Sequence, residues 1–135
     1  MKSFFALLLT AFSFTSCTKT AISHENSKPA ASNFYKDANV EVTYMNVVQS
    51  GPESVEINFS TLYEKDIQKI ELMSGANASK FCSIYVIDVT NNSESLKNYH
   101  IEDHNIKGNT MYYMFRFTYS NGDWSYSNYT LINLQ

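Results

Sequence analysis

The stretch "TMYYMFRFTYSNGDWSYSNYTLINL", residues 110–134, decides the fold. Side chains of two kinds alternate along its first half with a period of two, which is typical of a β-strand and not of a helix. One face carries Tyr113, Phe115, Phe117 and Tyr119, and the other carries Tyr112, Met114, Arg116 and Thr118. The segment "SNGDW" (120–124) predicts a hairpin turn, because Asn-Gly accepts the left-handed backbone that tight turns need. The stretch therefore predicts two long antiparallel strands.

Five more segments with strand character precede this stretch, and turn sequences rich in Ser, Asn and Gly separate them. They are residues 40–48, 54–60, 67–73, 80–89 and 96–102. The clearest is 54–60, where Val55, Ile57 and Phe59 alternate with polar residues and are predicted to face inward.

Three of these segments have less regular patterns. Simple alternation in 40–48 places Val40, Val42 and Tyr44 on one face. The spacing in 67–73 also suits a helical turn, and residues 80–89 are apolar on both faces. Seven strands in about 95 residues is the count and size of an immunoglobulin-like sandwich, so we predict an all-β, seven-stranded sandwich.

The strand sequences resemble the fibronectin type III family of immunoglobulin-like domains. "SVEINFS" (54–60), "IQKIEL" (67–72) and "YYMFRFTYSNGDWSYS" (112–127) are similar to its strands B, C and the F–G hairpin. The resemblance implies that Phe59 takes the place of a buried Trp in strand B and Ile70 that of a Tyr in strand C. It also implies that Tyr113 is the tyrosine at the corner before strand F. Such motifs imply a fold and not an activity.

The first sixteen residues predict the export signal of a lipoprotein. Lys2 supplies a positive charge, and "FFALLLTAFSF" (4–14) is an apolar run too short to span a bilayer as a permanent helix. The tetrad "FTSC" (14–17) resembles the bacterial lipobox, which implies cleavage before Cys17 and attachment of a diacylglycerol to its thiol. Phe14 stands where that motif usually has Leu. The alternative is a plain signal peptide with an incidental cysteine.

Lipidation would make Cys17 a membrane anchor rather than half of a disulfide, since each buried acyl methylene adds about 0.8 kcal/mol. The one other cysteine, Cys82, lies in an apolar run and is then expected to be a lone buried thiol. Residues 18–39 are rich in Ser, Asn, Ala and Lys and predict a flexible tether. We therefore divide the chain into a signal peptide (1–16), a lipidated cysteine with its tether (17–39) and a fibronectin type III-like sandwich (40–135).

The leader is similar to the short "SCxK"-type leaders of Bacteroidetes lipoproteins. Surface-exposed lipoproteins of that group often carry acidic residues directly after the cysteine, and "CTKTAIS" (17–23) carries none. The resemblance thus favours a lipid-anchored protein of the bacterial outer membrane that faces the periplasm. The formal net charge is −3 at pH 7, which gives the chain no electrostatic reason to bind nucleic acid.

The best cluster of potential metal ligands is "HIEDH" (100–104). In a strand the rings of His100 and His104 lie about 13 Å apart, too far to share one ion. No phosphate loop, nucleophile elbow or Cys/His cage is present in the sequence, so no catalytic set can be assembled. We therefore predict a protein that is not an enzyme and that uses no metal and no cofactor.

Aromatic residues form the best candidate binding patch. It consists of Trp124, Tyr112, Tyr126 and Tyr129, with Arg116 on the same face as Tyr112. Tyr and Trp combine a flat apolar face with a polar group, which suits stacking on sugar rings or anchoring a protein contact. The alternative is that Trp124 covers a loop and that the tyrosines only reflect the high β-propensity of this residue.

These patterns favour a lipid-anchored binding or adhesion module whose ligand is a glycan or a protein. The alternative is a structural or accessory protein of the cell envelope, which would pair an exposed sheet edge with a periplasmic partner.

Overall fold

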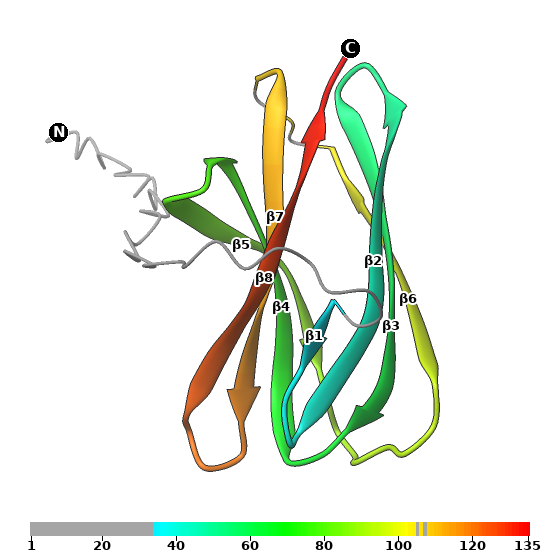
Figure 1. The fold of residues 1–135 in the computed structure, drawn as a ribbon, viewed down its shortest axis with the longest axis vertical. Coiled ribbons are helices and arrows are strands. Elements are labelled where there is room, and N and C mark those ends of the chain that lie inside the picture. Colours follow the sequence, from blue (N-terminus) through cyan, green and yellow to red (C-terminus); the bar gives the residue numbers. More distant parts are fainter. Residues whose placement is uncertain (1–33, 105, 107) are drawn as a thin grey trace, which may run out of the picture.

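The computed structural model describes residues 34–104, 106 and 108–135, and these form a sandwich of two antiparallel sheets without a helix (Figure 1). The first sheet has the order β1-β2-β3-β6 and the second the order β5-β4-β7-β8. The strands are β1 (Tyr35–Lys36), β2 (Val40–Gly51), β3 (Ser54–Glu64), β4 (Ile67–Asn77), β5 (Lys80–Asp88), β6 (Lys97–Asp103), β7 (Thr110–Tyr119) and β8 (Trp124–Asn133). The predicted all-β sandwich is confirmed, and no described residue belongs to a helix long and apolar enough to cross a membrane.

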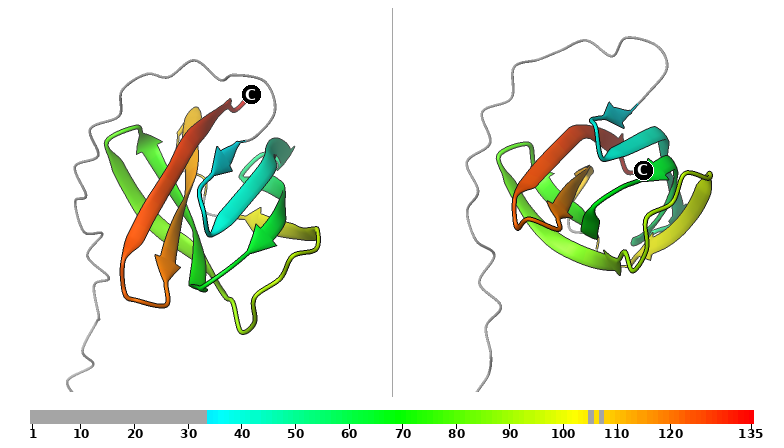
Figure 2. Two further views of the ribbon diagram at one scale, coloured as in Figure 1. Left: turned by 60° about the horizontal axis from the view of Figure 1, so that its bottom comes forward. Right: turned by 90° about the horizontal axis from the view of Figure 1, so that it is seen from below.

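The two sheets face each other as layers, which the end-on view of Figure 2 shows, and the core lies between them. Phe59 of the first sheet stacks on Tyr99 with ring centroids 4.7 Å apart, and it touches Phe115 of the second sheet at 4.5 Å. Burying an aromatic or branched side chain of this kind stabilises the fold by about 1.5–3 kcal/mol. The fully buried members of this core are Val40, Val42, Val55, Ile57, Phe59, Ile70, Tyr113, Phe115 and Phe117.

The segments that resemble strands B, C, F and G become β3, β4, β7 and β8. The last three lie in one sheet and β3 in the other, as in immunoglobulin-like sandwiches. Phe59 and Ile70, at the family's aromatic positions, are both fully buried. Tyr113 is buried as predicted for the corner tyrosine, and its hydroxyl donates a hydrogen bond of 3.0 Å to the Asp103 carboxylate.

Tyr44 departs from the predicted alternation. Irregular pairing of β2 with β3 between Glu41 and Tyr44 adds a bulge, so Val42 stays buried while Tyr44 turns outward and is exposed. Met45 and Val47 pack against the core in its place. The prediction that Tyr44 shares the face of Val42 is therefore wrong, because a bulge shifts every later residue to the opposite face.

Part of the predicted tether belongs to the sandwich. β1 pairs with β2, and the Tyr35 ring stacks on Phe117 with centroids 4.9 Å apart. Phe34 packs edge-on against Phe115 at 6.1 Å. The rest of the predicted tether, the signal peptide and Cys17 lie outside the described residues.

A buried carboxylate ties together the first sheet and the loop that follows β5. Glu64 is fully buried, and it accepts hydrogen bonds from Thr61 (2.8 Å), Tyr99 (2.6 Å) and the Lys97 ammonium (2.5 Å). Its backbone exchanges two hydrogen bonds with Ser93. A charge removed from water in this way is tolerated because it is paired and fully hydrogen-bonded.

Candidate functional site: an aromatic strip and an end pocket

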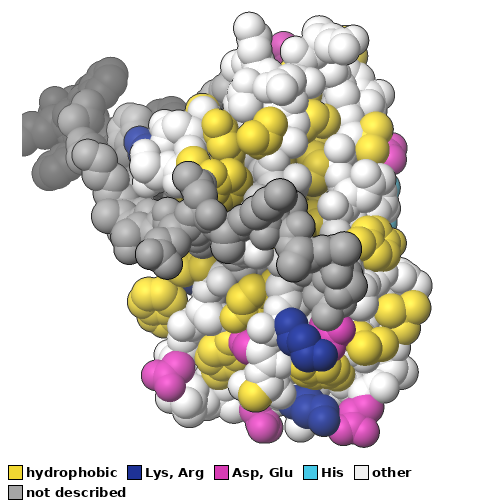
Figure 3. Space-filling view, viewed as in Figure 1, with side chains coloured by type: hydrophobic (Ala, Val, Ile, Leu, Met, Phe, Trp, Pro, Cys, Tyr) yellow, Lys and Arg dark blue, Asp and Glu magenta, His cyan; other side chains and the backbone are white. Residues whose placement is uncertain are grey.

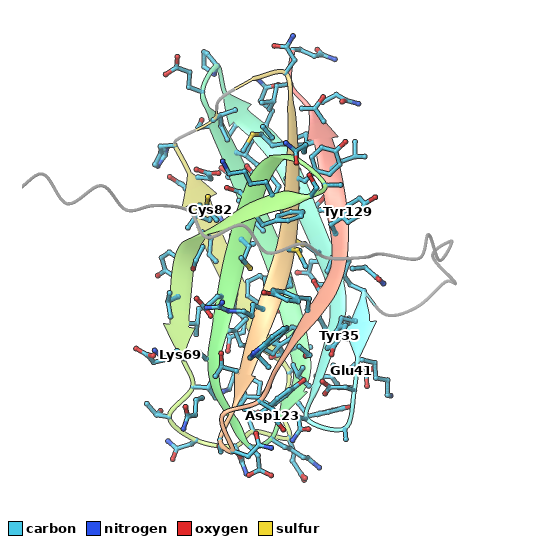
Figure 4. All side chains as sticks on the ribbon, turned by 90° about the vertical axis from the view of Figure 1, so that its left-hand side faces the viewer. Tyr35, Glu41, Lys69, Cys82, Asp123 and Tyr129 are labelled. Atoms are coloured by element: carbon cyan, nitrogen blue, oxygen red, sulfur yellow. The ribbon has the colours of Figure 1, made fainter. Side chains whose placement is uncertain are left out.

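The outer face of the second sheet brings the predicted patch together. Residues directly opposite each other in an antiparallel pair point to the same face. The register of β7 with β8 pairs Tyr112 with Leu131, Met114 with Tyr129, Arg116 with Tyr126 and Thr118 with Trp124. Tyr112, Tyr126, Tyr129 and Trp124 are therefore on one face, and we call these four residues the aromatic strip. Figure 4 looks onto this face, with Tyr129 on β8 and Asp123 at the β7–β8 turn.

A bulge in β8 makes this arrangement possible. Tyr126 and Tyr129 are three positions apart, so strict alternation would place them on opposite faces. The irregularity lies between the pairs of Met114 and Arg116, and the buried Ser127 hydroxyl accepts a hydrogen bond of 2.8 Å from the Phe115 amide. The bulge thus keeps both tyrosine rings on the outer face while the backbone stays hydrogen-bonded.

A small second core lies beneath the tyrosines. Met73, Phe81 and Met114 are buried on this outer side of the sheet, and Tyr112, Tyr126 and Tyr129 pack against them. The close approach of the chain around Gly75 permits this cluster, because a Cβ there would lie 2.1 Å from the Lys80 carbonyl oxygen. The three tyrosines are therefore half-buried platforms and not loosely held surface side chains.

Trp124 is the exposed end of the strip. Its side chain is 60% exposed, and its ring meets the Tyr126 ring edge-on with centroids 5.2 Å apart. Tyr112 and Tyr129 form a second edge-on pair at 5.5 Å. The alternative in which Trp124 covers a loop is therefore wrong, because most of the indole faces solvent.

Arg116 is fixed on the same face by an ion pair. Its Nε and its terminal nitrogen each lie 2.6 Å from Oε2 of Glu71, whose side chain is nearly buried on β4. Burial alone would lower the pKa of Arg116, but the hydrogen bond and charge of Glu71 raise it overall. Arg116 is thus already paired, and the net charge that it adds beside the strip is small.

A pocket opens at the end of the sandwich where the β7–β8 turn lies. Its volume is about 930 Å³, and Trp124 forms part of its wall. Three connections line it: residues 37–39 between β1 and β2, Asp66 between β3 and β4, and residues 119–123 at the β7–β8 turn.

Hydrogen bonds hold the three connections in place. Asp37 accepts from the amides of Asn39 and Val40 (both 2.7 Å), from the Tyr35 hydroxyl (2.9 Å) and from the Tyr119 hydroxyl. Asp66 has a φ of +51°, a left-handed conformation that Asp tolerates better than most residues. Its carbonyl accepts from the Ser120 amide at 2.7 Å, which joins the β3–β4 connection to the β7–β8 turn.

The pocket lining is rich in hydrogen-bond acceptors. Carboxylates of Asp37, Asp66 and Asp123 and the amides of Asn39 and Asn121 contribute, and no Lys or Arg is among its described lining residues. Acidic and basic side chains gather at this lower end of the molecule in Figure 3. Two lysines near this end are engaged with glutamates, in the pairs Lys36–Glu41 (2.6 Å) and Lys65–Glu94 (2.7 Å).

The histidine cluster is exposed at the end of β6. Glu102 lies between the two rings, 3.5 Å from His100 and 3.0 Å from His104. Within the described parts of the chain, no group of three or more His, Cys, Asp or Glu side chains is placed to hold a metal ion. The cluster therefore offers surface contacts between histidine and glutamate, and exposed contacts of this kind contribute little to stability.

Cys82 lies on β5 at the side of the second sheet (Figure 4). It is half-buried and disulfide-bonded. The prediction of a lone buried thiol at this position is therefore wrong. Cys17, the other cysteine of the sequence, lies outside the described residues.

Neither a protein-family model nor a curated protein matches the sequence. Among solved structures, the fold is similar to wild-type OgpA from Akkermansia muciniphila, with a TM-score of 0.54 and 10% sequence identity. The match covers 78% of this chain and 31% of OgpA, so the chain spans about a third of that protein. At this identity the likeness supports the β-sandwich fold alone.

Proposed function

We propose that this chain is a lipid-anchored binding module of the bacterial envelope, held to the outer membrane through Cys17 and facing the periplasm. Its binding surface is the aromatic strip. The carrying observation is that four aromatic side chains share the outer face of a sheet whose inner face already supplies the core. Aromatic side chains that gather on one outer face and remain partly accessible are typical of interaction sites.

Site-specific photo-crosslinking in cells tests this surface. Tyr126 is replaced by the photoreactive residue benzoylphenylalanine, and Tyr44, an exposed tyrosine on the outer side of the first sheet, is replaced in the same way as the matched control. Crosslinked species that form from position 126 and not from position 44 are the expected result. Equal crosslinking at both positions, or none at position 126, contradicts a binding role of the strip.

The anchor has a separate chemical test, because thioether formation uses the sulfur of Cys17. A lipidated Cys17 cannot also form a disulfide, so the disulfide of Cys82 in such a chain joins it to another molecule. We expect protein extracted from membranes to gain the mass of the lipid at residue 17 and to expose Cys82 to alkylation after reduction. An unlipidated chain whose two cysteines both become alkylated only on reduction would overturn the anchor.

Treatment of intact cells with an impermeant protease tests the periplasmic orientation. A periplasmic marker protein serves as the control for an intact outer membrane. Protection of the sandwich is the expected result, whereas rapid loss with the marker intact would place the domain on the cell surface.

One observation favours a second candidate, the accessory protein that pairs through a sheet edge. β5 is an edge strand of the second sheet, and no charged residue interrupts it between Lys80 and Asp88. Tyr85 and Val86 of this strand are exposed. A Val86→Lys substitution would block strand addition, so loss of a partner in this variant but not in Tyr126→Ala would favour the edge over the strip.

A further inference from the structure

The end pocket and the aromatic strip form one continuous site because Trp124 belongs to both. The indole lines the pocket and also stands opposite Thr118 at the end of the outer face. From there the rings of Tyr126 and Tyr129 follow along β8. The Trp124 and Tyr126 centroids are 5.2 Å apart, and Tyr126 and Tyr129 lie opposite Arg116 and Met114, which are two residues or about 7 Å apart on β7. A ligand that used the whole site would have to be elongated, with one end in the pocket.

The rings of the strip suit a ligand with flat apolar faces and polar edges. Trp124 presents mostly exposed indole, and Tyr126 and Tyr129 rest on Met73, Phe81 and Met114, which limits their motion. Held rings of this kind give up little conformational entropy when a ligand stacks on them.

The pocket adds a charge requirement. Its lining offers three carboxylates, and among the described lining residues there is no cation to compensate an anionic ligand. Asp37 already accepts four hydrogen bonds, whereas the Asp66 side chain is exposed and makes no hydrogen bond with a described residue. Acceptors of this kind favour hydroxyl donors and repel acidic groups.

We propose that this continuous site binds a neutral, linear oligosaccharide, with its terminal unit in the end pocket and the following units stacked along the aromatic strip. This inference rests on the proposed function, since it names the ligand class of the same surface. A pyranose ring combines an apolar face for the strip with hydroxyl donors for the acceptors of the pocket.

The chain carries its own reporter, because Trp124 is its one tryptophan. We would titrate the full-length protein, in a detergent without a sugar headgroup, with neutral oligosaccharides of two to six units and follow tryptophan emission. Uronic acid oligomers of the same lengths serve as charged probes. A change in emission with neutral oligomers that grows tighter with length, and no change with the charged ones, is the expected result.

Variants separate the parts of the site. Tyr126→Ala removes one stacking platform and should weaken binding about tenfold, while Tyr44→Ala on the other sheet should leave it unchanged. The double variant Asp66→Asn and Asp123→Asn keeps the side-chain shapes and removes two charges. It should bind neutral oligomers more weakly than the parent, because an amide oxygen is a weaker acceptor than a carboxylate, and it should begin to accept the charged ones.

Three results would overturn the inference. If the parent protein bound neutral and acidic oligomers equally well, the pocket carboxylates would not select the ligand. If Tyr126→Ala bound neutral oligomers as tightly as the parent, the aromatic strip would not be part of the site. Unchanged emission with every saccharide would exclude the ligand class. In this last case crosslinking from position 126 distinguishes the oligosaccharide proposal from the proposed binding function. A specific protein crosslink would support the binding function with a different ligand, and the absence of a crosslink would contradict both proposals.

Discussion

The outer faces of the two sheets carry different kinds of side chain. On the first sheet the outward residues are mostly polar and pair with each other, as in the contact of His100 Nδ1 with Asn58 Oδ1 (2.9 Å) and that of Ser60 with Asn98 (2.5 Å). On the second sheet the corresponding positions hold Met73, Met114 and the aromatic strip. Both faces belong to the same sandwich and look away from the same core.

This difference shows which face requires an explanation beyond folding. A polar outer face needs only water, and alternation of apolar and polar residues produces it in any two-layer sandwich. The second face buries three further hydrophobic side chains and still leaves Trp124 mostly exposed. Apolar surface kept in water has a cost, and the first sheet also exposes some, at Tyr44 (47%), Val48 (47%) and Leu62 (43%). The second sheet differs because its most exposed aromatic side chain, Trp124 (60%), stands at the end of a row of aromatic rings, which favours a ligand-binding role for that sheet.

Alkaline pH should unfold the sandwich and so abolish both outer faces. Burial and the Glu64 carboxylate raise the pKa of Tyr99, burial and Asp103 raise that of Tyr113, and burial and Asp37 raise that of Tyr119, all from an ordinary value of 10.0. The folded protein keeps these protons when the unfolded chain has lost them. Their contribution to stability is therefore complete below pH 10 and is lost as the pH rises above it.

The measurement is urea denaturation at pH 8, 10 and 11, followed by circular dichroism. We expect the free energy of unfolding to fall slightly between pH 8 and 10, where the tyrosines of the unfolded chain begin to ionise, and to fall steeply by pH 11. Tyr113→Phe should be less stable at pH 8 by about 1 kcal/mol, since it loses a buried hydrogen bond, but should lose less on going to pH 11. A profile that stays flat to pH 11 contradicts this account of the buried phenols.

The small core under the strip should carry measurable stability, which the polar face does not. Met114 is fully buried, so Met114→Ala should lower the free energy of unfolding by about 2–4 kcal/mol. Asn58→Ala, at an outward position of β3, should change it by less than about 0.5 kcal/mol. Similar losses in both variants would show that the two outer faces do not differ in packing.

The alternating strands were predictable, whereas the bulges and the second core were not. Phe115 and Phe117 follow a period of two, and that period alone assigns them to the interior. Tyr44 and Tyr129 each lie beyond a bulge, and a bulge depends on hydrogen bonds with the neighbouring strand that a single-strand pattern does not contain. The burial of Phe81 was not predictable for another reason, because it requires the close approach of the chain at Gly75.

The candidate site was predictable in its residues and not in its shape. Composition identified Trp124 and the tyrosines as one candidate patch, whereas strict alternation would have separated Tyr126 from Tyr129. The pocket escaped prediction because its walls come from three connections far apart in the sequence, joined by contacts such as that of Ser120 with Asp66. Asp and Asn in turns are usually explained by local backbone needs, so their sequence carries no separate signal of a pocket.

The ion pairs on the two faces should differ in strength. Glu71 is nearly buried, so Arg116→Gln leaves its carboxylate without a charged partner and should cost about 1–2 kcal/mol, allowing for the partial exposure of Arg116. The pair of His100 with Glu102 is exposed and 3.5 Å long, and His100→Gln should have no measurable effect. Chemical denaturation at pH 7 in low salt checks both, and a loss in the histidine variant as large as in the arginine variant contradicts the contrast.

The smallest expected effect is the most informative about function. Trp124 contacts Tyr126 only edge-on and is mostly in solvent, so Trp124→Ala should change the free energy of unfolding by less than about 0.5 kcal/mol. Tyr126→Ala should cost somewhat more, because that ring also packs on the second core. If Trp124→Ala instead destabilised the sandwich by as much as Met114→Ala, the indole would be part of the packing and its exposure would need no ligand. A stable variant, by contrast, leaves the large exposed ring without a structural role, and binding is then the remaining physical reason to keep it on this face.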